Sequence, residues 1–219
     1  MTRRAVVFGT GYLAEVVHFY LTHDSEYDVV AFTASAAAIE QPGFVGLPLV
    51  PFEEVETRYP PADHEMFVAV GYTKMNQVRE RFCEEARSKG YKLLTYVCSR
   101  ATHWRDTTIG DNVFVFEDNT IQPFVTIGSG VILWSGNHIG HHAAIGDYCF
   151  LTSHVVVSGA TQVGRRSFIG VNATLRDDIK VGADNLIGMG AMVTKSTHDG
   201  EVHVAQHTKR IDKPAVDLL

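Results

Sequence analysis

The second half of this 219-residue chain is built on a repeat of six residues. An aliphatic residue occupies every sixth position without a gap, at Ile109, Val115, Ile121, Ile127, Leu133, Ile139, Ile145, Leu151, Val157, Val163, Ile169, Leu175, Val181, Ile187 and Val193. Such a repeat predicts a parallel β-helix, because each hexapeptide can form one short strand and one corner with the aliphatic side chain inside. Three hexapeptides close a triangular coil, so the fifteen repeats predict five coils of 18 residues.

Residues 1–97 follow a different pattern, in which short apolar runs alternate with segments of helical period. The runs at 4–9, 28–33, 66–71 and 93–97 predict strands, and the segments 12–23 and 74–89 predict helices. This alternation is typical of a small parallel α/β sheet. We therefore assign residues 1–97 to a Rossmann-like α/β domain, 98–198 to the β-helix and 199–219 to a C-terminal tail.

Composition excludes several classes of protein. The net charge of −6 argues against a nucleic-acid-binding protein, which would carry a basic patch. No apolar run approaches the ~18 residues that a membrane-spanning helix requires. The three cysteines form no CxxC pair, so neither a disulfide framework nor a structural zinc site is expected. We therefore expect a cytoplasmic protein with no membrane or nucleic-acid partner.

One window of the repeat region is almost uncharged. Between Ile121 and Gly164 the only charged residue is Asp147, although 20% of the whole chain is charged. The same window contains four of the eleven histidines, which are His138, His141, His142 and His154. We therefore expect the function of this protein to depend on histidines that lie on an otherwise uncharged surface.

Several motifs in this layout resemble those of one known family. The motifs are Val7-Phe-Gly9-Thr-Gly11, Asn76-Gln-Val-Arg79, Ile139-Gly-His141, Gly159, Ile169-Gly-Val-Asn172 and Val202-His-Val-Ala-Gln-His-Thr-Lys209. Together with an α/β domain followed by five coils, they resemble the bacterial sugar acetyltransferases of the sialic acid O-acetyltransferase and bacillosamine or perosamine N-acetyltransferase type.

This resemblance implies a left-handed β-helix, acetyl-CoA as the donor and a nucleotide-linked sugar of surface-glycan biosynthesis as the acceptor. It also implies a homotrimer with its active sites between neighbouring helices. In such a trimer we interpret the uncharged window as the surface that packs against a neighbour, because buried charges are costly. We expect the exception, Asp147, to be a solvated corner residue.

The resemblance implies that His141 is the catalytic base. Acyl transfer from a thioester requires a base for the attacking amine or hydroxyl, and histidine titrates close to neutral pH. The chain has no GxSxG nucleophile motif, which favours direct attack. With 18 residues per coil, Gly159 stacks on His141 and its N–H could meet the thioester carbonyl. Relatives usually carry an acidic residue where this chain has His142, so the residue that orients His141 is one of Asn137, His138 and His142.

The remaining candidate residues fall into two groups. For CoA we expect contacts from Gly159, Gly170, Asn172, Gly188, Gly190 and Lys195, since glycine permits close approach. For the nucleotide sugar we expect contacts from Gly9, Gly11, Gly71, Asn76 and Arg79, with the glycines of the first turn holding a phosphate. Four extra residues separate Gly71 from Asn76 in comparison with relatives, which leaves the nucleotide open.

The leading prediction is therefore acetyl transfer to an amino or hydroxyl group of a nucleotide-linked sugar, and an alternative is a sialic-acid-type O-acetyltransferase. A zinc lyase of the β-helix carbonic anhydrase type would use H-x4-H spacing, which His138, His141 and His142 do not have, so no metal is expected. An ice-binding solenoid would need ranks of threonine. A Rossmann-type oxidoreductase would need an acidic residue after the second strand, and none is present.

Overall fold

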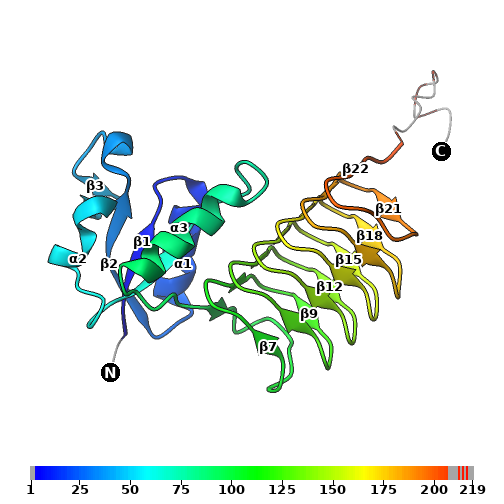
Figure 1. Cartoon of the computed structure of the whole chain (residues 1–219), viewed down its shortest axis with the longest axis horizontal. Helices are drawn as coiled ribbons and strands as arrows, with labels where there is room; N and C mark the ends of the chain where they lie inside the picture. Colours follow the sequence, from blue (N-terminus) through cyan, green and yellow to red (C-terminus); the bar gives the residue numbers. More distant parts are fainter. Residues whose placement is uncertain (1–2, 207–211, 213, 215, 217–219) are drawn as a thin grey trace.

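The computed structural model describes residues 3–206, 212, 214 and 216 of the chain. It consists of an N-terminal α/β part and a parallel β-helix whose coils stack away from it (Figure 1). Within the described residues, no helix is both long and apolar enough to cross a membrane.

A five-stranded sheet organises the N-terminal part, and its order is β3-β4-β2-β1-β5. All neighbouring strands are parallel except β3 and β4, which form a short antiparallel pair. The elements are β1 (Arg3–Phe8), α1 (Tyr12–His23), β2 (Tyr27–Ala34), η1 (Ala36–Ala38), β3 (Gly43–Phe44), β4 (Leu47–Pro51), η2 (Phe52–Glu54), α2 (Val55–Arg58), β5 (Glu65–Val68) and α3 (Gln77–Ser88).

Helices cover both faces of this sheet. Alternate residues of β1 belong to different apolar clusters, as expected for a strand that is buried on both sides. Val7 packs in the cluster that contains Val17 of α1, whereas Val6 packs in the cluster that contains Phe82 of α3. The apolar run of β1 is therefore explained by burial on both faces.

The fifteen predicted repeats form fifteen two-residue strands, each ending on the aliphatic residue of its hexapeptide. They are β7 (Thr108–Ile109), β8 (Phe114–Val115), β9 (Thr120–Ile121), β10 (Thr126–Ile127), β11 (Ile132–Leu133), β12 (His138–Ile139), β13 (Ala144–Ile145), β14 (Phe150–Leu151), β15 (Val156–Val157), β16 (Gln162–Val163), β17 (Phe168–Ile169), β18 (Thr174–Leu175), β19 (Lys180–Val181), β20 (Leu186–Ile187) and β21 (Met192–Val193). The predicted parallel β-helix of five coils is confirmed.

The coils stack in register, so that each residue pairs with the residue 18 positions later. Ile127 lies beside Ile145, for example, and His138 lies beside Val156. The strands form three parallel sheets, and the aliphatic residues fill a continuous core between them. Figure 1 shows one of these sheets, β9, β12, β15, β18 and β21, running along the axis of the helix.

Three rows of corners join the sheets. We call them the β12/β13 corner (122–125, 140–143, 158–161, 176–179), the β13/β14 corner (128–131, 146–149, 164–167) and the β14/β15 corner (116–119, 134–137, 152–155, 170–173). Many corners contain a non-glycine residue with positive φ, such as Phe124, His142, His154 and Asn172. The left-handed conformation, uncommon for non-glycine residues, is therefore a regular part of this β-helix.

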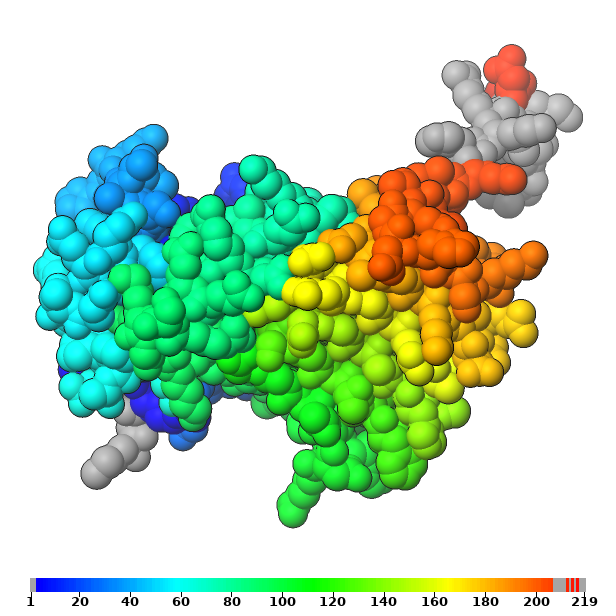
Figure 2. Space-filling view, viewed as in Figure 1, coloured from blue at the N-terminus to red at the C-terminus, as the bar shows by residue number. Residues whose placement is uncertain are grey.

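The N-terminal part covers one face of the β-helix, which we call the junction face (outward side chains of β8, β11 and β14). Phe114, Ile132 and Phe150 of this face are buried in the same cluster as Val7 and Phe67. Tyr20 of α1 donates a hydrogen bond to Glu117 at one edge of the face. Figure 2 shows the opposite edge of this contact, where the surface of α3 continues into that of the middle coils.

Two predicted elements of the N-terminal part differ from the structure. The predicted strand 93–97 is reduced to an isolated bridge between Leu93 and Met66, and β6 (Tyr96–Val97) pairs with β8 of the β-helix instead. The helix predicted from 74 begins only at Gln77, because residues 74–76 have positive φ. Elements β3, β4 and α2 have no counterpart in the sequence prediction, since their segments are too short to show a period.

Candidate active site

His141 and His142 follow β12 at the β12/β13 corner, where the backbone is held by neighbouring coils. The His141 N–H donates to Oε1 of Gln122 at 2.8 Å, and the His141 carbonyl accepts from the N–H of Ala160 at 2.8 Å. These two contacts come from the coils before and after His141. The base of the side chain is therefore fixed, while the imidazole itself is exposed.

Gly159 of the next coil lies directly against the His141 ring. A Cβ atom at this glycine would be 2.7 Å from Cε1 and 2.8 Å from Nε2 of His141. Carbon atoms in van der Waals contact are ordinarily about 3.5–4.0 Å apart, so a side chain would displace the ring. The missing side chain of Gly159 thus creates the space that the imidazole occupies.

His142 contacts His141 edge to face. The two Nδ1 atoms are 3.2 Å apart, and the ring planes are inclined by 86°. On its other side the His142 ring packs on Phe124, with a centroid separation of 4.7 Å. Of the three candidate orienting residues, Asn137 is committed elsewhere, since its amide bonds Trp134 and Val155 at the β14/β15 corner. His138 lies on β12, before the corner.

The predicted CoA residues lie on two corners. Gly170, Asn172, Gly188 and Gly190 all belong to the β14/β15 corner or its continuation, on the far side of the β12 strand face from His141. A Cβ at Gly170 would lie 2.5 Å from the Met189 nitrogen, so this glycine is required by coil stacking alone. Lys195 is exposed and stands three coils beyond His141 in the same column of the β-helix.

Three of the predicted nucleotide-sugar residues gather at the carboxyl ends of β1 and β5. Gly9 has a φ of +127° and a Cβ there would lie 2.8 Å from the Ala69 carbonyl oxygen, so the two loops touch. Gly11 is the N-cap of α1, and Gly71 follows β5. A Cβ at Gly11 or Gly71 would meet nothing within 4 Å, which leaves the backbone of both open to a ligand.

Arg79 has a structural role that the sequence does not reveal. Its side chain is completely buried and donates to the carbonyl oxygens of Val70, Gly71, Gly130, Tyr148 and Cys149 at 2.7–3.3 Å. These contacts use the donors of the guanidinium group, so none is left for a substrate. Arg79 joins α3 to the β13/β14 corner instead of binding the nucleotide sugar.

Asn76 is likewise buried at the junction. Its Nδ2 donates to the carbonyl of Arg166 at 2.8 Å, and its backbone caps α3 in the left-handed conformation. The adjacent Glu80 forms ion pairs with Arg165 and Arg166. Residues 76–80 therefore fasten the start of α3 to the β-helix, and Asn76 has no exposed surface to offer a ligand.

Asp147, the exception in the uncharged window, is exposed at the β13/β14 corner. Its Oδ1 accepts the Ser129 N–H at 2.8 Å and so satisfies a backbone donor of the preceding coil. Asp147 is thus a corner residue with a hydrogen bond of its own. A groove of about 780 Å³ runs beside it along the face of β7, β10, β13, β16 and β19, and small neutral residues form most of its lining.

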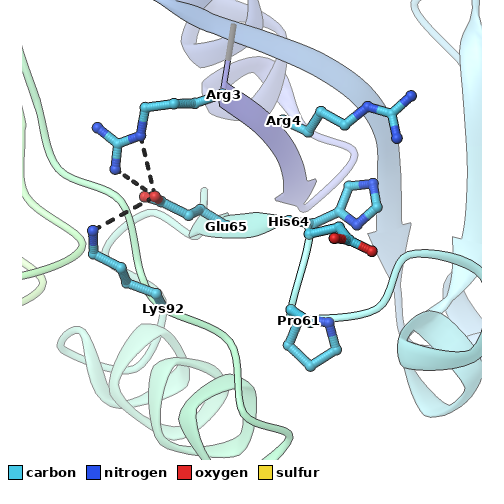
Figure 3. A pocket seen from close by; sticks show the side chains of 8 residues that line it. Arg3, Arg4, Pro61, His64, Glu65 and Lys92 are labelled. Atoms are coloured by element: carbon cyan, nitrogen blue, oxygen red, sulfur yellow. Dashed lines mark hydrogen bonds and ion pairs between the residues drawn. The ribbon is translucent and has the colours of Figure 1, made fainter. Parts of the chain in front are cut away.

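A hollow of about 420 Å³ lies at the opposite end of the N-terminal sheet from Gly9 and Gly11 (Figure 3). Its charged groups are largely paired with one another. Glu65 accepts from Arg3, and the Lys92 ammonium is 3.5 Å from the same carboxylate. This hollow is separate from the histidine corner and from the glycines of the first turn. Among the described residues, no group of three or more histidines, cysteines or acidic residues could hold a metal ion.

Comparison with known proteins identifies the repeat. The family described as "Bacterial transferase hexapeptide (six repeats)" matches residues 106–141 and 125–159. Curated protein sequences give no match. The repeat and the fold confirm the resemblance to the hexapeptide-repeat sugar acetyltransferases with a left-handed β-helix.

Solved structures extend this similarity over nearly the whole chain. PerB from Caulobacter crescentus, in complex with CoA and GDP-perosamine, is 25% identical with a TM-score of 0.82, and the match covers 94% of this chain and 95% of that one. The acetyltransferase domain of PglB from Neisseria gonorrhoeae is 24% identical with a TM-score of 0.83, covering 93% and 97%. WeeI from Acinetobacter baumannii is 19% identical with a TM-score of 0.70, again covering 93% and 97%.

Proposed function

We propose that this protein transfers an acetyl group from acetyl-CoA to the amino group of a nucleotide-linked sugar, with His141 as the general base. The observation that carries the proposal is the His141 imidazole lying against the side-chain-free backbone of Gly159. The similar structures support the substrates, because PerB is described with CoA and GDP-perosamine and the PglB domain with acetyl coenzyme A. They also favour an amine over a hydroxyl acceptor, since the Caulobacter enzyme is described as a perosamine N-acetyltransferase.

The proposed reaction is a direct attack on the thioester. The acceptor amine forms a C–N bond to the acetyl carbon while His141 takes its proton, and the C–S bond then breaks. The proton passes to the departing CoA thiolate, so the products are the amide and free CoA. The Gly159 N–H is the donor that we assign to the developing oxyanion. Burial raises the pKa of Cys83 and of Cys149 to about 12, which argues against a cysteine nucleophile.

We assign acceptor binding to the α/β domain, residues 1–97, which we interpret as Rossmann-like. Gly11 and Gly71 present open backbone beside Gly9 at the carboxyl ends of parallel strands, where ligands of α/β sheets bind. The start of α1 suits a diphosphate, because its N–H groups and helix dipole attract anions. Acyl transfer is assigned to residues 98–198. Of the predicted tail 199–219, Val202 and His203 form a short strand, β22, that pairs with β20 of the last coil. The tail motif resembles the family as far as Lys209, although residues 207–211 lie outside the described residues.

The two half-sites lie on different sides of one chain, which supports a homotrimer. The α/β part covers the junction face and the corners on both sides of it, through Tyr20 to Glu117 and through Arg79 to Gly130. His141 stands on the remaining corner, opposite the junction face. An acceptor held by the α/β domain therefore reaches a His141 only if a second copy supplies it. The neutral groove beside β13 offers a surface for that copy.

Sedimentation should accordingly give a mass about three times the 24.2 kDa of the chain. The measurement is analytical ultracentrifugation at micromolar concentration, with and without CoA. A species near 24.2 kDa under both conditions would contradict the trimer.

The activity itself is tested by CoA thiol release with UDP-, GDP- and dTDP-linked amino sugars and their hydroxy counterparts. We expect release with at least one amino sugar and a higher melting temperature in the presence of CoA. The proposal fails if no sugar gives thiol release and CoA leaves the melting temperature unchanged. We also propose a reducing, cytoplasmic setting, which the three free and buried cysteines support.

Replacing Gly159 with alanine should lower kcat by roughly 10²-fold, because the new Cβ displaces the His141 ring from its position. The ring is the exposed end of a flexible side chain, so the free energy of unfolding should change by less than about 1 kcal/mol. If Gly159→Ala retained the full kcat, the position of the His141 ring against residue 159 would not matter for catalysis.

A further inference from the structure

We infer that His141 and His142 form a pair that shares one proton, in which neutral His142 orients His141 by accepting its Nδ1–H. The catalytic part of this inference rests on the proposed function, whereas the proton sharing does not. His142 is thereby assigned as a positioning residue that acts through His141. A neutral imidazole takes the place that a carboxylate would hold in a histidine–acid pair.

The geometry fits one proton shared between the two rings. At 3.2 Å the two Nδ1 atoms are within hydrogen-bond distance, and a hydrogen bond needs one donor and one acceptor. If His141 donates, its Nε2 carries a lone pair, and this nitrogen lies beside Gly159. If His142 donated, the His141 Nε2 would carry the proton and could not act as a base. A catalytic His141 therefore selects the arrangement in which His142 is the acceptor.

The structure holds His142 in the accepting position. Its backbone has a φ of 58° and its N–H donates to the Pro123 carbonyl at 3.2 Å. Its ring packs on Phe124 of the preceding coil, with the ring centroids 4.7 Å apart. The His142 ring is thus positioned by its backbone hydrogen bond to Pro123 and by its contact with Phe124. No charged side chain is needed to hold it.

The groups that face the pair are neutral. Gln122 and Phe124 come from the preceding coil, Gly159 and Ala160 come from the next one, and His138 precedes the pair on β12. The charged residues of this corner row are Arg105 and Asp106, two coils before the pair, and Arg176, Asp177 and Asp178, two coils after it. The coils directly before and after the pair therefore contribute no charged side chain to this corner.

Two coupled protonation steps follow from this arrangement. The first proton leaves the hydrogen bond intact, because one imidazolium can donate to the remaining neutral ring. The second proton turns both Nδ1 atoms into donors that face each other, so like charge and lost bonding oppose it.

The test that needs no substrate is a pH titration of the ¹⁵N-labelled histidines by NMR. We expect His141 as the Nδ1–H tautomer at high pH and a two-step curve in the wild-type protein. His142→Asn, whose amide oxygen can accept the same bond and which suits positive φ, should keep the tautomer but give a single step. An Nε2–H tautomer of His141 in the wild-type protein, or the same curve in His142→Phe, would overturn the pair.

Kinetics tests the catalytic part. His142→Phe removes the acceptor and should lower kcat by roughly 10²-fold, with the KM for acetyl-CoA unchanged, and His142→Asn should recover most of the loss. His142→Glu should shift the acidic limb of kcat/KM to higher pH by about one unit, because a carboxylate raises the pKa of His141. Unchanged kcat in His142→Phe, or an unshifted limb in His142→Glu, would refute orientation by His142.

Two controls separate the possible failures. His154→Phe makes the same exchange in the same coil at the same φ of 58°, so its melting temperature reports the cost of the aromatic residue at such a corner. If the melting temperature falls further for His142→Phe than for His154→Phe, the loss of kcat in His142→Phe is due to misfolding. The kcat of His142→Asn then decides whether His142 orients His141. If the wild-type protein releases no thiol but shows the two-step titration, the proposed function fails and the proton-sharing pair stands.

Discussion

Replacement of His141 by alanine should lower kcat by about 10²–10⁴-fold, with little change in the affinity for CoA. The imidazole is exposed and is not part of the apolar core, so its removal should leave the fold intact. The backbone contacts of residue 141 with Gln122 and Ala160 do not depend on the side chain. Thiol release under saturating substrates measures kcat, and calorimetric titration measures the affinity for CoA.

His23→Ala is the matched control, because His23 is an exposed histidine at the end of α1, away from the β-helix corner. It should keep kcat within about twofold. If His141→Ala also stays within a few-fold of the wild-type protein, His141 is not the base. If both variants lose activity together with their melting transition, the loss is due to misfolding. The assignment of His141 as the base then has no support from this experiment.

Arg79→Met should lower the free energy of unfolding by about 3–5 kcal/mol, the largest stability effect that we expect in this chain. The guanidinium donates to five backbone carbonyls at the contact between α3 and the β-helix, and methionine removes the donor from each; only the Cys149 carbonyl keeps a second one, the Ile132 N–H. Burial lowers the pKa of Arg79 to about 10, so the group stays charged at neutral pH. Denaturant titration followed by circular dichroism measures the loss.

Arg81→Met on the same helix makes the same exchange at an exposed position. Its ion pair with Glu85 is solvated, so the expected loss is under about 1 kcal/mol. Arg79→Lys should recover only part of the stability, because a single ammonium cannot reach the carbonyls that the planar guanidinium spans. Equal denaturation midpoints for Arg79→Met and Arg81→Met would refute the structural role of Arg79.

The β-helix could be predicted almost completely because one local rule fixes it. A strand of two residues and a corner need only an aliphatic residue at the right interval, and stacking in register repeats the same contacts every 18 residues. For the same reason, the contact between Gly159 and the His141 ring follows from counting along the chain. The positive φ of His142 or Phe124 has no such sequence signal, since neither is a glycine.

The junction could not be predicted, because its contacts join residues far apart in the sequence. Arg79 and Asn76 form a polar motif next to a glycine, which in isolation indicates a phosphate-binding loop. Their burial depends on α3 meeting the β13/β14 corner some 50–90 residues later along the chain. Tyr96 and Val97 likewise pair with Phe114 and Val115 of β8 rather than continue the first sheet.

The buried guanidinium of Arg79 also has a consequence for movement during turnover. Together with the shared apolar cluster of Phe67, Phe114 and Phe150, it joins the two parts of the chain into one body without a flexible linker. A hinge between them would have to expose a charge and several aromatic rings at every cycle. We therefore expect catalysis without domain closure, so that substrates enter and products leave through a cleft of constant width.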